Sequence, residues 1–254
     1  GFLAALVLGS AQVQLPEDIR AAFRTAGLSH ALVASGFHLS VLLGTVLLLA
    51  RRWPPGLRLP LAAMALLLFV CLAGAQPSVV RAVLMAAMAL LIREAGHHSR
   101  PVGVLLLTLS GMLLLRPAWA LSIGFQLSAA ATAGLILTAP RLERAVQAWL
   151  PDRCQGLAAA CSIPLAALVW TLPLQLLHFG AMPLYALVAN LLVAPLLAPL
   201  TLLAMLSALL VLVGPPAVLP MLLWPVHQLA GLVITMASWI SHWPGAPLLT
   251  GRPQ

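Results

Sequence analysis

Long apolar runs, broken by arginine, proline or glycine, dominate the chain and predict a series of membrane-spanning helices. A helix needs about 20 mostly apolar residues to cross the hydrocarbon core of a bilayer. Eight segments meet or approach this length, which predicts an all-α, polytopic transmembrane domain. The segments are residues 28–50, 59–75, 78–92, 102–115, 118–139, 157–177, 184–213 and 218–240.

Two of these segments are irregular. Residues 102–115 are short for a span, and residues 184–213 are long and contain Pro195 and Pro199. Each proline removes a backbone donor, so we expect structural breaks at Pro195 and Pro199 and two half-helices or a re-entrant segment there. Pro77 marks a further break, between the second and third segments.

Two amphipathic segments predict helices that lie on the membrane surface. Pro16 precedes Glu17 and Asp18, an acidic first turn, and residues 16–27 then alternate charged and apolar side chains. Residues 141–150 (RLERAVQAWL) have the same character.

Composition supports one integral membrane domain over residues 1–254. Hydrophobic residues make up 62% of the chain and charged residues only 7%, far below the roughly 25% of a soluble domain. The chain opens with Gly1 rather than Met, so we interpret it as a fragment of a longer protein. Cys71, Cys154 and Cys161 form no CxxC pair, which indicates neither a zinc site nor a disulfide framework.

The net charge of +8 reflects thirteen arginines against five acidic residues, and eight of the arginines lie in the loops 51–58, 93–100 and 140–153. If eight spans alternate, these loops share one side, and the positive-inside rule places that side in the cytoplasm of a bacterial inner membrane. The opposite loops contain only Arg116, while Arg20 and Arg24 fall on that side within the first surface helix.

With this topology, polar residues of several spans collect in the outer half of the membrane. We predict that they line a water-filled vestibule open to the outside, above an apolar inner half suited to a constriction. An alternative is that they hydrogen-bond helices to one another. The residues are His30, Ser35, His38, Arg81, Gln126, Gln175, His178 and Asn190.

Arg81 stands out because an arginine within a membrane helix costs about 3 kcal/mol on insertion scales. No span supplies an acidic partner. Its charge therefore meets an anionic substrate, carbonyls or water, or else it snorkels to the interface one turn away at Pro77.

The motif ASGFH contains the only chemistry that suggests catalysis. Ser35 and His38 lie about 60° apart on a helix, and Gly36 permits close approach of another backbone. A serine near a histidine leaves an intramembrane hydrolase open as an alternative, but nothing marks an oxyanion hole or an acid that orients the histidine. No metal or phosphate-loop motif occurs, so we expect no enzyme activity, no metal and no cofactor in this domain.

Four blocks of the sequence resemble the membrane channel domain of the ComEC family of competence proteins. They are GLSHALVASGFHLSVLLG (27–44), GAQPSVVRAVLMA (74–86), IGFQLSAAATAGL (123–135) and LPLQLLHFGAMPLYALVANLLVAP (172–195). Phe37 and Leu39 stand where the family often has Leu and Val. The matching polar and glycine positions are His30, Ser35, Gly36, His38, Arg81, Gln126, Gln175, His178 and Asn190, together with Pro77.

The resemblance implies a channel that conducts single-stranded DNA into the cell during natural transformation. It also implies partners: membrane lipid, OB-like and metallo-β-lactamase-like domains of the parent chain, a cytoplasmic ATPase or helicase, a periplasmic DNA receptor, and further copies of the chain in a homo-oligomer. A secondary transporter of a small anion is the alternative from another class, for which one expects an inverted repeat that the hydropathy lacks.

Overall fold

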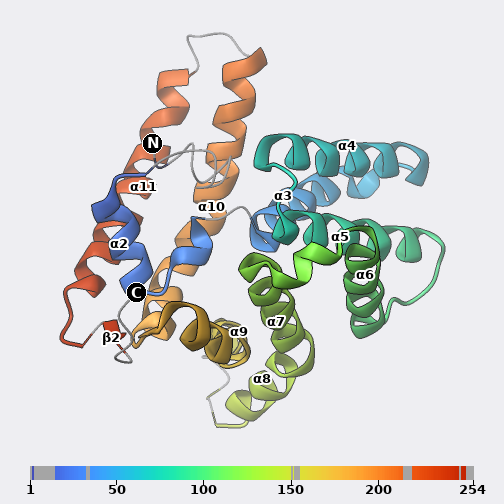
Figure 1. Ribbon diagram of the computed structural model, residues 1–254. Coiled ribbons are helices and arrows are strands. Elements are labelled where there is room, and N and C mark those ends of the chain that lie inside the picture. The colour runs from blue at the N-terminus through green and yellow to red at the C-terminus, as the bar shows by residue number, and fades with distance from the viewer. Residues whose placement is uncertain are drawn as a thin grey trace. The chain divides into compact units, whose positions relative to one another are not determined.

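The computed structural model describes residues 2, 15–32, 35–149, 151, 155–213, 219–245 and 247–249. Within them the chain is almost wholly helical, with one short pair of strands, β1–β2 (Figure 1). The elements are α2 (Glu17–Thr25), η1 (Ser29–Ala31), α3 (Gly36–Leu49), η2 (Ala50–Arg52), α4 (Pro55–Ala73), α5 (Pro77–Glu94), α6 (Pro101–Leu115), η3 (Pro117–Leu121), α7 (Ile123–Leu137), α8 (Ala139–Gln147), α9 (Gln155–Phe179), β1 (Ala181–Pro183), α10 (Ala186–Val213), α11 (Leu219–Ser241) and β2 (Pro247–Leu249). The predicted all-helical class is confirmed.

The chain divides into two compact units. Unit 1 comprises Gly1–Val83 and Pro183–Ala246, and unit 2 comprises Leu84–Met182 and Pro247–Gln254. The boundary at Val83 falls inside α5, so the first turns of that helix belong to unit 1.

In unit 1, the long helices α10 and α11 pack side by side, and α2 lies against α11 (Figure 1). Buried residues recur every three or four positions along both long helices, which places them on one face of each. They include Val193, Leu197 and Leu200 on α10. The amphipathic α2 inserts Phe23 into the same core, while its charged residues stay outside.

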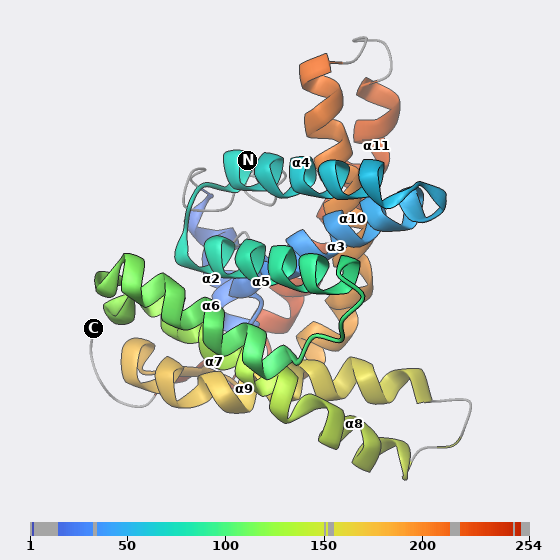
Figure 2. The ribbon, with the colours of Figure 1, turned by 90° about the vertical axis from the view of Figure 1, so that its right-hand side faces the viewer.

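In unit 2, α7 and α8 both pack on α9 (Figure 2). The approach of α7 to α9 is closest at Gly134, where a Cβ atom would lie 2.7 Å from the carbonyl oxygen of Ala166. Only glycine fits there without displacement of the backbone. Near this contact, the indole nitrogen of Trp170 donates to Thr138 Oγ1 at 2.9 Å.

The structure gives fewer membrane spans than the eight that the apolar pattern predicts. Among the described residues, four helical segments are long and apolar enough to cross a bilayer, or five if α7 and α8, bent by 43°, form one broken span. The four are Gly56–Ala73, Gln155–Phe179, Ala186–Ala208 and Leu223–Ser241.

The missing spans have specific physical causes. The helix expected over 28–50 begins only at Gly36, and its 14 residues extend about 21 Å at 1.5 Å per residue. The helix α6 has 15 residues, and α5 carries Arg81, Arg93 and Glu94 among its 18. The depth assigned to the polar residues rested on eight alternating spans, so the structure does not support that assignment.

The expected breaks at Pro195 and Pro199 are not present. Both prolines lie inside α10, which is one helix from Ala186 to Val213 rather than two half-helices. Pro195 and Pro199 are four residues apart and both exposed, so they lie on the same side of the helix, which continues through them. Pro77, in contrast, begins α5, which agrees with a break at that point.

The two expected surface helices are present as helices. The first, predicted over 16–27, is α2, and the second, predicted over 141–150, is α8, which begins two residues earlier. Residue 150 lies outside the described residues. That either helix lies on a membrane surface stays a prediction.

Candidate functional site

The first turn of α3 brings together several of the residues singled out in the sequence. Ser35 precedes the helix with an extended backbone, but its side chain makes no capping hydrogen bond to the helix. Its Oγ is instead hydrogen-bonded to His38 Nδ1, at 3.2 Å. Since the first amides of a helix lack an acceptor within it, this end of α3 offers N–H donors and the positive end of the helix dipole.

Arg81 of α5 lies against the same turn. Its Nη2 atom is 3.6 Å from the position that a Cβ of Gly36 would occupy. Arg81 as a whole residue is 7% exposed, so its side chain is packed against the protein rather than extended into solvent. Gly36 allows this approach, as the ASGFH motif predicted, and both residues belong to unit 1.

His38 is the most deeply buried of the predicted polar residues, at 1% exposure. The Phe37 ring stands edge-on to the imidazole, with ring centroids 5.7 Å apart. Nδ1 bonds Ser35, whereas Nε2 has no hydrogen-bond partner among the described residues. A buried nitrogen without a partner is unfavourable by roughly 1–3 kcal/mol and therefore indicates a functional or ligand-dependent role.

A second group of predicted residues meets in unit 2, between α7 and α9. Gln126 Nε2 donates to the Ala120 carbonyl at 2.8 Å, and its Oε1 lies 2.9 Å from His178 Nε2. Because a carbonyl oxygen only accepts, His178 carries its proton on Nε2 in this arrangement. Gln175, on the same helix as His178, donates to Thr171 Oγ1 at 2.8 Å.

Asn190 and His30 are less closely engaged with other helices. The amide of Asn190 donates to the Ala186 carbonyl of its own helix at 2.7 Å. His30 lies in η1, before the start of α3, and is exposed. The predicted residues thus form one group on the first turn of α3 and another between α7 and α9, and a single shared vestibule stays a prediction.

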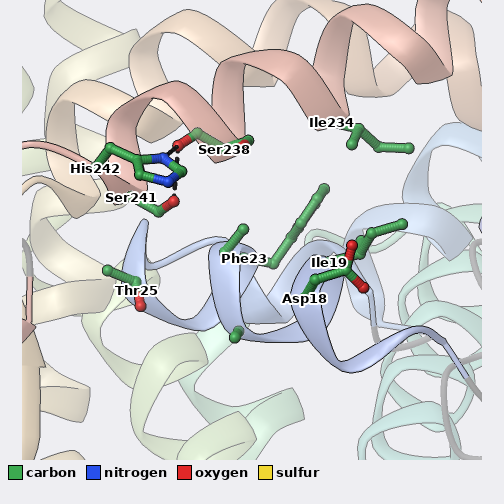
Figure 3. Close-up of a pocket in the computed structure, with 10 residues that line it drawn as sticks. Asp18, Ile19, Phe23, Thr25, Ile234, Ser238, Ser241 and His242 are labelled. Carbon is green, nitrogen blue, oxygen red and sulfur yellow. Dashed lines mark hydrogen bonds between the residues drawn. The ribbon is translucent and has the colours of Figure 1, made fainter.

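A pocket of about 340 Å³ lies elsewhere in unit 1, between α2 and α11 (Figure 3). Its polar lining residues include Asp18, Ser241 and His242. His242 Nδ1 donates to the Ser238 carbonyl at 2.6 Å, and Ser241 Oγ donates to the same oxygen at 2.7 Å. Both side chains therefore hydrogen-bond the C-terminal end of α11, and none of the residues predicted to line the vestibule contributes to this pocket.

Some notable positions had no clear signal in the sequence. Ser162 and Thr201 are each 1% exposed, and their hydroxyls have no partner among the described residues. Nothing in the apolar runs around them distinguishes the two. For Gly134, the small residues of SAAATAGL gave a weak indication of close helix packing. Within the described part of the chain, no three His, Cys, Asp or Glu side chains gather at a position suited to a metal ion.

These features describe a helical membrane protein with buried polar groups at helix ends and interfaces. The comparison with family models then identifies the class: the chain matches the model described as "Competence protein" over residues 6–254 and belongs to that family.

Two curated relatives agree with this. The chain is 28% identical over 199 residues to "ComE operon protein 3" of Bacillus subtilis (strain 168), a match that covers 77% of this chain and 24% of the relative. It is 27% identical over 238 residues to "Uncharacterized protein YcaI" of Escherichia coli (strain K12), covering 87% of this chain and 31% of that protein. The chain thus spans less than a third of each relative's length. No solved structure matches it.

Proposed function

We propose that this domain is an inner-membrane channel for the inward transport of single-stranded DNA during natural transformation. The competence family to which the chain belongs suggests a role in DNA uptake in transformation, and its apolar helices make it a membrane protein. The channel activity, the single-stranded substrate and the inner-membrane location are our proposals.

The observation that carries the proposal is the first turn of α3, with Arg81 beside it. A strand of DNA presents one phosphate per nucleotide, and a protein that conducts it needs cations and N–H donors that bind phosphate reversibly. Helix N-termini and arginines are the groups that proteins use for phosphate. Here both types of donor lie within a few ångströms of Gly36.

A further argument is the position of Arg81 itself. An arginine within an apolar helix is unfavourable and is usually tied to a function. An exposed arginine would suffice for solubility, whereas Arg81 is withdrawn from solvent and packed on another helix. A phosphate that passes this turn would add to the interactions that Arg81 already makes.

In this account the domain performs no covalent step of its own. The direction of transport and the driving force come from partners, such as a cytoplasmic ATPase or helicase, a periplasmic DNA receptor and other domains of the full-length chain. A homo-oligomer of the domain would be compatible with the same role.

The test is a series of substitutions at Arg81 in the full-length protein of a naturally transformable host. Arg81→Glu should abolish transformation because it replaces an attractive charge with a repulsive one. Arg81→Gln should lower it by about tenfold to a hundredfold, the range expected when charge-assisted hydrogen bonds are lost. Arg81→Lys, which keeps the charge, should retain more activity than Arg81→Gln.

The matched control is Arg100→Gln, at an exposed arginine that precedes α6. It should transform close to the wild-type level. Immunoblots of the membrane fraction show whether each variant is present in normal amount. Normal transformation by Arg81→Glu would remove Arg81 from the path and the proposal with it.

One observation favours a second function, an intramembrane hydrolase. Ser35 Oγ and His38 Nδ1 are within hydrogen-bonding distance, as a nucleophile and a general base require. Ser35→Ala separates the two functions, because a hydroxyl that only lines a path is dispensable and a nucleophile is not. Transformation that persists in this variant supports the channel, and its complete loss with normal protein levels supports the hydrolase.

A further inference from the structure

A corner between α3 and α4 carries two arginines next to exposed leucines. Leu48 and Leu49 end α3 and are 62% and 75% exposed. Arg51 and Arg52 follow in η2 and are exposed as well. The four side chains line an open concavity of about 400 Å³. We call this surface the α3–α4 corner.

The corner lies where the chain enters a membrane-spanning helix. Trp53 follows directly and is 51% exposed, and the apolar segment Gly56–Ala73 begins three residues later. Tryptophan gathers at the boundary between lipid tails and water, and arginine at a span's end reaches toward the headgroups. The sequence order therefore places the two arginines at headgroup level, beside leucines that face the acyl chains. Figure 2 shows that α3 and α4 lie next to each other.

Both cations are available to a ligand. Neither Arg51 nor Arg52 makes a side-chain hydrogen bond or an ion pair among the described residues. Two neighbouring guanidinium groups without acidic partners suit a phosphate, which arginine binds through two parallel hydrogen bonds.

We propose that the α3–α4 corner binds an anionic phospholipid, with its phosphate on Arg51 and Arg52 and an acyl chain against Leu48 and Leu49. Basic pockets at the ends of membrane helices bind such headgroups in other proteins. The apolar half of the surface favours a lipid over nucleic acid, because single-strand binders combine charge with aromatic stacking rather than exposed leucines. The inference is independent of the proposed DNA path.

The experiment measures lipid retained by the purified protein in detergent, by native mass spectrometry, during titration with phosphatidylglycerol or phosphatidylcholine. The wild type should prefer phosphatidylglycerol, and Arg51→Gln/Arg52→Gln should weaken that binding by roughly fivefold per arginine, about 30-fold in all. Arg51→Lys/Arg52→Lys keeps the charge and should retain most of the preference. The control Arg93→Gln/Arg100→Gln removes two exposed arginines at the end of α5 and just before α6 and should leave it unchanged.

Two further measurements distinguish a bound lipid from free phosphate and from single-stranded DNA. Leu48→Ser/Leu49→Ser should weaken binding of the diacyl lipid, while inorganic phosphate and a single-stranded oligonucleotide should fail to displace that lipid from the wild type. The proposal is overturned if the glutamine pair at 51 and 52 binds phosphatidylglycerol like the wild type, or if the Arg93→Gln/Arg100→Gln control loses as much. It is also overturned if the leucines make no difference, or if phosphate or the oligonucleotide displaces the lipid.

Discussion

The first turn of α3 and the α7–α9 interface both bury polar groups among apolar helices, but they use them differently. At the α7–α9 interface, Gln126 and His178 hydrogen-bond each other, and Trp170 donates to Thr138. On the first turn of α3, Ser35 Oγ hydrogen-bonds His38 Nδ1, and His38 Nε2 has no partner among the described residues.

The space around the glycine also differs between the two places, Gly134 in α7 and Gly36 in α3. A Cβ at Gly134 would lie 2.7 Å from the Ala166 carbonyl and 2.9 Å from the Trp170 ring, closer than real contacts allow. A Cβ at Gly36 would lie 3.6 Å from Arg81, an ordinary contact distance. The α7–α9 interface is therefore tightly packed at Gly134, whereas the first turn of α3 has an ordinary contact at Gly36 and a buried His38 Nε2 without a partner among the described residues.

The largest effect is expected at Gly134. Gly134→Ala forces a backbone oxygen and an indole apart, and overpacking of this kind destabilises by about 1–3 kcal/mol. The free energy of unfolding in detergent and the amount of protein in the membrane should both fall. Gly111→Ala on α6 is the control, since a Cβ there meets no atom within 4 Å. Equal stability of the two variants would contradict the tight packing.

At Gly36 the effect should fall on uptake rather than on stability. Gly36→Ala adds only an ordinary contact with Arg81 and should transform nearly normally. Gly36→Leu displaces the guanidinium and should reduce transformation by about tenfold to a hundredfold, as for the loss of charge-assisted bonds. Membrane levels of the two variants should match. If the leucine variant transforms normally, Arg81 does not act from this position.

His38→Leu tests whether the buried imidazole serves packing or function. A leucine of similar size removes the unpartnered Nε2, which favours unfolding, together with the Ser35 hydrogen bond, which opposes it. Because the two effects offset each other, the free energy of unfolding should change by less than about 1 kcal/mol. Transformation should nevertheless decline. A variant that is much less stable would instead show that His38 is a structural residue.

The smallest effect is expected for the Gln126–His178 pair. A double-mutant cycle with Gln126→Leu and His178→Leu should give a coupling of about 0.6 kcal/mol, typical of hydrogen bonds between membrane helices. Uptake should follow the small change in stability. A large loss of uptake without a change in unfolding would place both residues on the DNA path, as the sequence predicted.

The sequence predicted the helical class and the two amphipathic helices because apolar runs and charged faces are local properties. It failed on the number of spans. The pattern over 28–50 is predominantly apolar, yet the helix starts at Gly36, since a 3-10 turn and a serine with extended backbone precede it. Hydropathy measures side-chain polarity, so it does not predict where the backbone is non-helical within an apolar segment.

The approach of Gly36 to Arg81 was only partly predictable. The ASGFH motif indicated that something comes close to Gly36, and Arg81 was notable as a cation within an apolar segment. Their pairing depends on how α3 and the first turns of α5 pack, which no local pattern encodes. The hydrogen bond from Trp170 to Thr138 spans 32 positions and was missed for the same reason.

The most direct test of the central claim is photo-crosslinking of DNA during uptake. A photoreactive amino acid replaces Phe37, an exposed side chain on the first turn of α3, or Leu135, an exposed side chain of α7 next to Gly134, in the full-length protein. We predict that labelled single-stranded DNA crosslinks at position 37 and not at position 135. Crosslinking at neither position, or equally at both, in variants that still transform would contradict a DNA path along the first turn of α3.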